Sequence, residues 1–253
     1  DPVYAKEITQ LSDVADPEEL FFDLSKDQSD FYDVVVTDYF SENGRFHGAI
    51  YQPFTYEQQE AIEADLLDEE ANRAYQQQRN LYEFMRRMLV KRFESSFGAF
   101  AKSIRNFERI HQCVLDFIEN SGGKYILDRK LIEKIYENDP DEIEEALEEF
   151  ERRLAAQEKR PKHARVYNIS TFNLQDEFIQ DIEADLQLMG EIRAKVEALD
   201  LVAHDPKAAR LVKALQDIIS FPVEKGEPLR KVIIFTEYMD TVKHLRPILE
   251  KAF

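Results

Sequence analysis

From Thr55 to Asn120 the sequence follows a helical pattern almost without interruption, and this stretch constrains the fold more than any other feature. Apolar residues recur there every three or four positions, as on the buried face of an α-helix. Ser95, Ser96 and Gly98 are its weakest points, so we expect two or three helices rather than one. Helix-forming residue types dominate the whole chain, which has only seven Gly in 253 residues. The sequence therefore predicts a mainly α protein.

Further helices are predicted on both sides of this stretch. Ser25 and Gln28 have the spacing of a capping box, in which side chains satisfy the first amides of a helix. The run from Asp141 is strongly acidic and has one narrow apolar stripe. The predicted helices cover residues 26–40, 129–137, 141–159 and 174–199, and a strand is predicted over 166–172.

The last fifty residues change character. Asp205-Pro206 begins a helix, a loop follows, and Lys231–Tyr238 contains a continuous apolar run that is typical of a strand buried in a parallel sheet. A helix over Met239–Phe253 comes next. This order is the opening of an α/β domain, but one buried strand needs neighbours on both sides, so we expect that domain to be truncated. The predicted division is a helical body over 1–200 and the start of an α/β lobe over 201–253.

The charge and the single cysteine narrow the class of protein. The formal net charge of −18 repels nucleic acid and membrane surfaces, so any DNA contact needs a local basic patch, and a partner with a basic face is the simpler inference. Cys113 alone can form no disulfide within the chain, which is typical of a reducing cytoplasm. No apolar run approaches the ~18 residues of a membrane span, so no membrane partner is expected. The chain does not begin with Met, and we expect it to be a piece of something longer.

No catalytic residue, cofactor site or metal site can be assembled from the sequence. There is no phosphate-binding P-loop, and Gly122-Gly123-Lys124 is better explained as a helix stop followed by a turn. No two of the five His have the spacing of metal ligands, and no Ser, Cys or Thr has a base at a recognisable offset.

One stretch of this acidic chain is locally basic, and it supplies the candidate nucleic-acid contacts. If residues 79–110 form one continuous helix, five cations fall within about 60° of one another, opposite a wide apolar face. These candidates for phosphate contact are Arg87, Lys91, Lys102, Arg105 and Arg109. The alternative is that they pair with the acidic helix at 141–151 inside the fold. The alignment fails if the helix breaks at Ser95–Gly98.

Three segments resemble Swi/Snf-type helicase-like ATPases, superfamily 2 proteins, and in particular their bacterial members. The first is Phe21–Val36, which matches the family pattern at Leu24, Ser25, Gln28 and Tyr32. The second is Met88–Phe100, which matches at Leu89, Lys91, Arg92, Glu94, Ser95, Ser96, Ala99 and Phe100. The third comprises Lys207, Leu211, Lys231–Tyr238 and Thr241–Leu245, and its apolar strand corresponds to the fourth conserved helicase motif.

The resemblance implies that this chain lies between the two RecA-like lobes of an ATP-driven DNA translocase and ends in the opening of the second lobe. The family's P-loop and D-E-x-H box would lie upstream and its arginine finger downstream. ATP and Mg²⁺ are therefore implied for the parent protein and not for this chain. Thr236, after the motif IV strand, is a further nucleic-acid contact that only the resemblance implies. Its alternative role is to satisfy backbone groups at the end of the strand.

The main alternative is a helical protein-interaction module whose acidic helix recruits a basic partner. A P-loop encoded upstream would favour the motor, and a stop codon directly after Phe253 would favour the module.

Overall fold

The computed structural model describes residues 15–57, 69–128, 164–223 and 230–253. Its α-helices are α1 (Lys26–Val34), α3 (Glu69–Ser95), α4 (Phe97–Asn120), α7 (Gln175–Ala198), α8 (Pro206–Ser220) and α9 (Met239–Ala252). Its strands are β1 (Lys124–Asp128) and β2 (Ala164–Asn168). The prediction of a mainly α protein is confirmed. The helices predicted over 129–137 and 141–159 lie outside the described residues.

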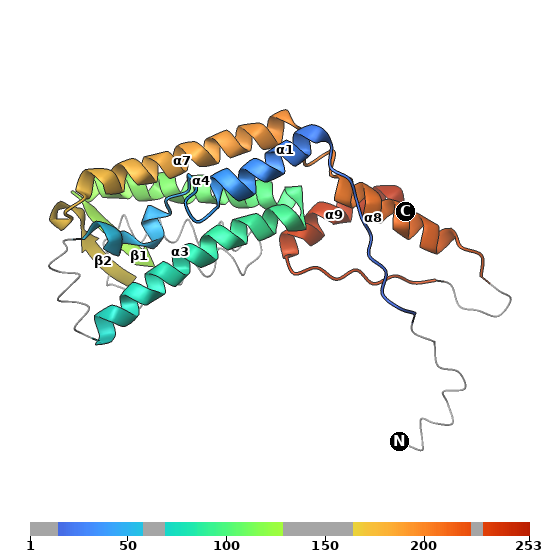
Figure 1. Ribbon diagram of the computed structural model, residues 1–253, viewed down its shortest axis with the longest axis horizontal. Coiled ribbons are helices and arrows are strands. Elements are labelled where there is room, and N and C mark those ends of the chain that lie inside the picture. The colour runs from blue at the N-terminus through green and yellow to red at the C-terminus, as the bar shows by residue number, and fades with distance from the viewer. Residues whose placement is uncertain (1–14, 58–68, 129–163, 224–229) are drawn as a thin grey trace, which may run out of the picture.

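The long helices form an elongated body with a different structure at each end (Figure 1). Helix α4 packs along both α7 and α3, and α1 lies beside them. The strands β1 and β2 pair antiparallel at one end, with Lys124 opposite Asn168. Helices α8 and α9 pack on one another at the other end, where α9 also contacts α4. We call α1, α3, α4 and α7, with the turns between α1 and α3, the helical body.

The first helix begins as its capping box predicts. The Ser25 side chain accepts from the amide of Gln28, whose side chain accepts in return from the amide of Ser25. Helix α1 continues into a π-helical turn, Val35–Tyr39, so the helix predicted over 26–40 is confirmed. The chain then turns at Gly48, whose φ of 63° is in the left-handed region that favours glycine.

Aromatic side chains dominate the core of the helical body. Rings from α4, α7 and the turns after α1 pack edge to face or tilted at centroid distances of 5–7 Å, the geometry that aromatic pairs prefer. The largest fully buried side chains include Phe46, Tyr51, Phe100, Phe107 and Phe178. Helix α4 lies at the centre of this core because its apolar residues contact both α3 and α7.

The strand predicted over Lys231–Tyr238 is wrong. No residue of this segment belongs to a helix or strand, and Ile233 and Phe235 are 77% and 88% exposed. An apolar β-branched run favours a strand, but a strand forms only where a neighbour accepts and donates its backbone hydrogen bonds. Among the described residues none does so here. The helix predicted next, over Met239–Phe253, is confirmed as α9.

None of the helices in the described ranges combines the length and the apolar character needed to cross a lipid bilayer.

Candidate functional site: the junction between α3, α4 and α9

A single residue, Ser96, separates α3 from α4. Its φ of −161° and ψ of 146° are extended, so the chain leaves the helical conformation for one residue. Its amide still donates to the carbonyl of Arg92, and its hydroxyl accepts from the amide of Ala99. Ser96 therefore ends one helix and caps the next, which is a common role for serine because its short side chain reaches the free amides of a first turn.

The first turn of α9 lies against this break. Asp240 is 2.5 Å from the Arg92 guanidinium and 3.5 Å from Lys102 Nζ. The side chains of Arg92 and Asp240 are 6% and 9% exposed, so this ion pair is shielded from water. Next to it, the hydroxyls of Ser95 and Thr241 lie 2.9 Å apart. We call these five residues the polar latch.

A second acid–base pair lies beside the polar latch. Asp205 Oδ1 accepts from the amides of Lys207 and Ala208 and so caps α8, while Asp205 Oδ2 lies 3.1 Å from Nε2 of His244 on α9. The His244 ring lies directly against Gly98 of α4. A Cβ at Gly98 would come within 2.5 Å of the ring, so only glycine allows α9 to approach α4 this closely.

Other parts of the chain meet at the same junction. Tyr32 of α1 donates its hydroxyl to Glu94 of α3, and Lys207 of α8 donates to the carbonyl of Glu94. Gln28 of α1 donates to the carbonyl of His204, the residue before the cap of α8. Segments more than sixty positions apart in the sequence are therefore joined at the end of α3.

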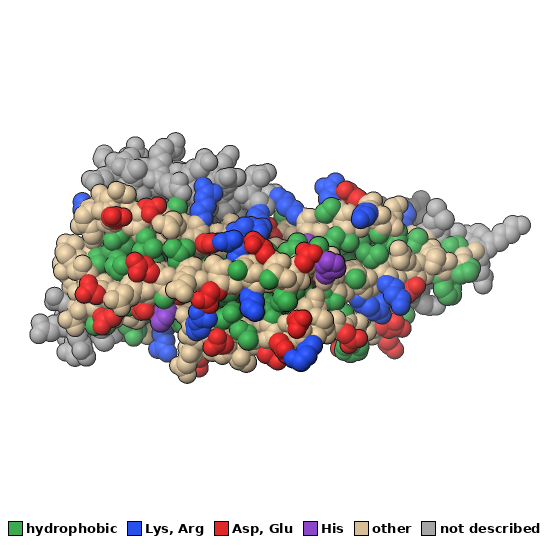
Figure 2. All heavy atoms as spheres, turned by 90° about the horizontal axis from the view of Figure 1, so that it is seen from above, with side chains coloured by type: hydrophobic (Ala, Val, Ile, Leu, Met, Phe, Trp, Pro, Cys, Tyr) green, Lys and Arg blue, Asp and Glu red, His purple; other side chains and the backbone are tan. Residues whose placement is uncertain are grey.

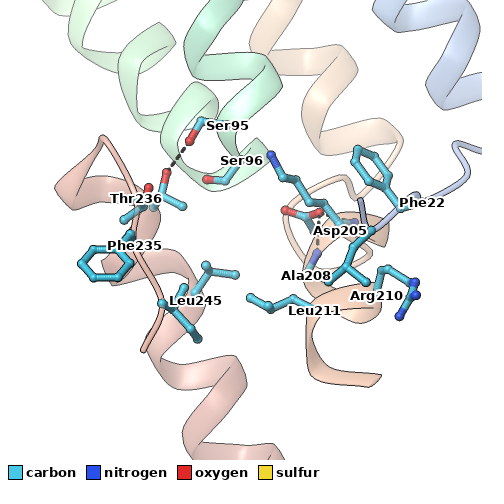
Figure 3. A pocket seen from close by; sticks show the side chains of 14 residues that line it. Phe22, Ser95, Ser96, Asp205, Ala208, Arg210, Leu211, Phe235, Thr236 and Leu245 are labelled. Carbon is cyan, nitrogen blue, oxygen red and sulfur yellow. Dashed lines mark hydrogen bonds between the residues drawn. The ribbon is translucent and has the colours of Figure 1, made fainter. Parts of the chain in front are cut away.

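A pocket of about 250 Å³ opens beside the junction (Figure 3). Leu245 of α9 and Leu211 of α8 face one another across it, and Phe22 lies at its edge (Figure 3). Its hydroxyl groups already have partners within the protein: Ser95 contacts Thr241, and Ser96 caps α4. The lining is thus mainly apolar, and its charged residues Asp205, Lys207 and Arg210 each have a partner within the protein.

The five predicted cations do not form one stripe, because the break at Ser96 places them on two helices. Arg87 and Lys91 are exposed on α3, and Arg87 lies 3.4 Å from Glu83. On α4, Arg105 is exposed and Arg109 half-buried, while Lys102 faces Asp240. The premise of a continuous helix was wrong. The acidic helix at 141–151, the alternative partner of these cations, lies outside the described residues.

Charges of both signs are interspersed along the face drawn in Figure 2. Arg45, Arg86 and Arg193 also pair with acidic side chains of the helical body. Of the five predicted cations, the exposed ones are Arg87, Lys91 and Arg105, and these three are accessible to a phosphate.

Thr236 is exposed, and its hydroxyl accepts from the amide of Tyr238 at 3.4 Å. This contact is the backbone role that the sequence left open as an alternative. The Arg92 guanidinium lies over the Tyr238 ring, 4.4 Å from the centre of that ring. This cation–π contact links the segment before α9 to α3.

A buried polar cluster inside the helical body was missed from the sequence. Asp185 of α7 is fully buried, accepts from the amides of His47 and Gly48 at 2.7 Å each, and lies 3.7 Å from His111 Nε2. The signal was present: Asp185 interrupts the apolar stripe of α7 three residues after Ile182. A carboxylate on a buried face needs such donors, so the cluster fixes the turn after α1 onto α7.

Burial also affects the pKa of Tyr56, which ends the short helical turn Pro53–Tyr56. Tyr56 donates its hydroxyl to Asp181 at 2.7 Å. Burial, and then this hydrogen bond to a carboxylate, raise the pKa of Tyr56 far above that of an exposed tyrosine. Its hydroxyl therefore stays protonated and serves as a donor.

Comparison with protein-family models, with curated proteins and with solved structures finds no match to this chain. In the parts of the chain that the structure describes, no group of His, Cys, Asp and Glu is arranged to bind a metal ion. What the structure shows at the junction is the polar latch, whose contacts join α3, α4 and α9.

Proposed function

We propose that this chain is the helical segment between the two motor lobes of a helicase-like, ATP-driven DNA translocase. In this proposal the junction attaches the helical body to the opening elements of the second RecA-like lobe. The parent protein hydrolyses ATP with Mg²⁺, and this chain contributes coupling and DNA contact.

The observation that carries the proposal is the meeting of the three segments that resemble the family. Tyr32 of the first contacts Glu94 of the second, and Ser95 of the second contacts Thr241 of the third. Lys207, also of the third, donates to the carbonyl of Glu94. Local likenesses that arise by chance have no reason to lie together in space, so their contact supports one shared origin.

The exposed apolar segment gives a second line of support. Val232–Phe235 has the composition of a strand with both faces covered, yet its side chains are between 39% and 88% exposed. Under the proposal, the further strands of the second lobe pair with it and bury it. An exposed apolar run of this kind is costly in water unless a partner covers it.

Duplex DNA binding by the chain, titrated in salt, tests the proposal. The variant carries Arg87→Gln, Lys91→Gln and Arg105→Gln, the accessible predicted cations. Three phosphate contacts predict about 40-fold weaker binding of the unaltered chain between 50 and 200 mM salt, and the variant should lose most of this dependence.

The matched control removes the same charge elsewhere, through Lys195→Gln, Lys213→Gln and Lys251→Gln, all exposed. DNA binding that weakens equally in both variants would show a net-charge effect and contradict a DNA-tracking site on α3 and α4. No binding at low salt would overturn the DNA contact and favour the protein-interaction module.

A further inference from the structure

We infer that α8 and α9 form one unit that the polar latch fastens to the helical body, and that this unit can detach while the body stays folded. This inference does not depend on DNA binding. In the proposed motor, such a unit would let the second lobe change its orientation relative to the body.

The first argument is the extent of the hydrophobic core. Among the described residues, the continuous core runs from Phe31 to Leu201 and includes nothing from α8 or α9. The buried residues of α9 are Asp240 and Thr241, both polar. Because apolar burial supplies most of the cooperativity of a fold, a unit outside the core can open separately from it.

The second argument is the nature of the contacts that cross between the two parts. They include the ion pairs of Asp240 with Arg92 and Lys102, the hydroxyl contact of Ser95 with Thr241, and the bond from Lys207 to a carbonyl of α3. The Arg92 guanidinium over Tyr238 and the His244 ring against Gly98 lie beside them. Buried ion pairs recover their cost of desolvation only in good geometry, and removal of one partner leaves a buried charge uncompensated. An attachment of this kind is therefore stable while all its partners are in place and becomes unstable when one partner is lost.

The third argument is the connection between α7 and α8. Leu201 is fully buried and anchors the end of the body, whereas Val202 and His204 after it are exposed. Asp200 has a φ of 45°, the left-handed conformation of a tight turn. A short exposed stretch between an anchored residue and the cap of the next helix is where a hinge absorbs rotation.

The two helices of the unit are also joined to each other. Asp205, the cap of α8, contacts His244 of α9, and α8 also packs on α9. The pair is buried, with side-chain exposures of 4% and 7%. In Figure 1 the two helices lie side by side at one end of the molecule, and they should move together when the polar latch opens.

Amide hydrogen exchange of the full chain, resolved by segment, tests the inference in Asp240→Asn. Losing the charge that faces Arg92 should speed exchange in both α8 and α9 by roughly 100- to 1000-fold and leave α4 and α7 unchanged. Asp217→Asn, at an exposed position of α8, is the matched control and should change neither part.

A disulfide tests the same point in the opposite direction. Ser95→Cys with Thr241→Cys, in a Cys113→Ser background, replaces two hydroxyls that lie 2.9 Å apart. Added to Asp240→Asn, it should restore slow exchange in α8 and α9 when oxidised and lose the effect when reduced. Faster exchange in all helices together, in α9 alone, or in none would overturn the inference.

Discussion

Replacement of Gly98 by Ala sets a gain in helix stability against a clash, and the structure predicts which effect wins. An alanine costs less conformational entropy than glycine within a helix, and the substitution is usually worth about 0.5–1 kcal/mol of added stability. At Gly98, however, the new Cβ would lie 2.5 Å from Cγ and Nδ1 of His244 and 2.9 Å from its Cβ. The clash reaches the base of the side chain, so rotation of the ring cannot relieve it.

The His244 side chain can move away only by breaking its hydrogen bond to Asp205. A hydrogen bond to a charged group contributes about 1.5–3 kcal/mol, which exceeds the helical gain. Because α4 stays helical when α9 detaches, the helical gain is the same in both states, and we expect Gly98→Ala to weaken the attachment of α9 by about 1.5–3 kcal/mol. Exchange of α9 amides should speed up accordingly, while α7 is unaffected.

Gly190 of α7 provides the matched control. A Cβ there would lie 3.8 Å from Glu108 Oε1, an ordinary van der Waals distance, so only the helical gain remains. Gly190→Ala should raise the free energy of unfolding by about 0.5–1 kcal/mol in urea denaturation. If Gly98→Ala is stabilising to the same extent and leaves α9 protected, the close approach of α9 to α4 is refuted.

Three further predictions concern the helical body. Phe107→Ala empties a fully buried position of the core and should cost about 3–5 kcal/mol in urea denaturation. Asp185→Asn weakens the acceptor of two backbone amides and should cost about 2–4 kcal/mol, with near-ultraviolet circular dichroism reporting loosened aromatic packing. The raised pKa of Tyr56 means that the unfolded chain releases this proton first, so the free energy of unfolding should fall as pH rises above about 10. Tyr56→Phe should reduce that fall, and a pH series of denaturation curves in which it does not would contradict the donor role toward Asp181.

The helices were predictable where local chemistry fixes them. Ser25 and Gln28 specify the start of α1 through contacts only three residues apart, and Pro206 after Asp205 specifies the start of α8. A break was predicted at Ser95, Ser96 or Gly98 as well, and it lies at Ser96, because serine favours a cap over a helix interior.

Features that depend on distant partners were not predictable. Lys231–Tyr238 has the composition of a strand, but a strand is defined by its neighbour, and none lies among the described residues. Arg92 and Asp240 pair across 148 positions in a chain with 33 basic and 51 acidic residues, so no local pattern distinguishes this pair from the others. The Asp185 cluster depends in the same way on amides 137 and 138 positions away.

The break at Ser96 that divides the predicted stripe of cations also makes the polar latch possible. On one continuous helix, Arg92 and Lys102 would be about 15 Å apart along the axis and about 80° apart around it, far from a shared contact. Because the chain leaves the helix for one residue, both side chains reach the same carboxylate of Asp240, at 2.5 and 3.5 Å. A substitution that made α3 and α4 continuous would therefore separate these cations and release α9. The function that we propose for the junction thus depends on the one residue in this region that is not helical.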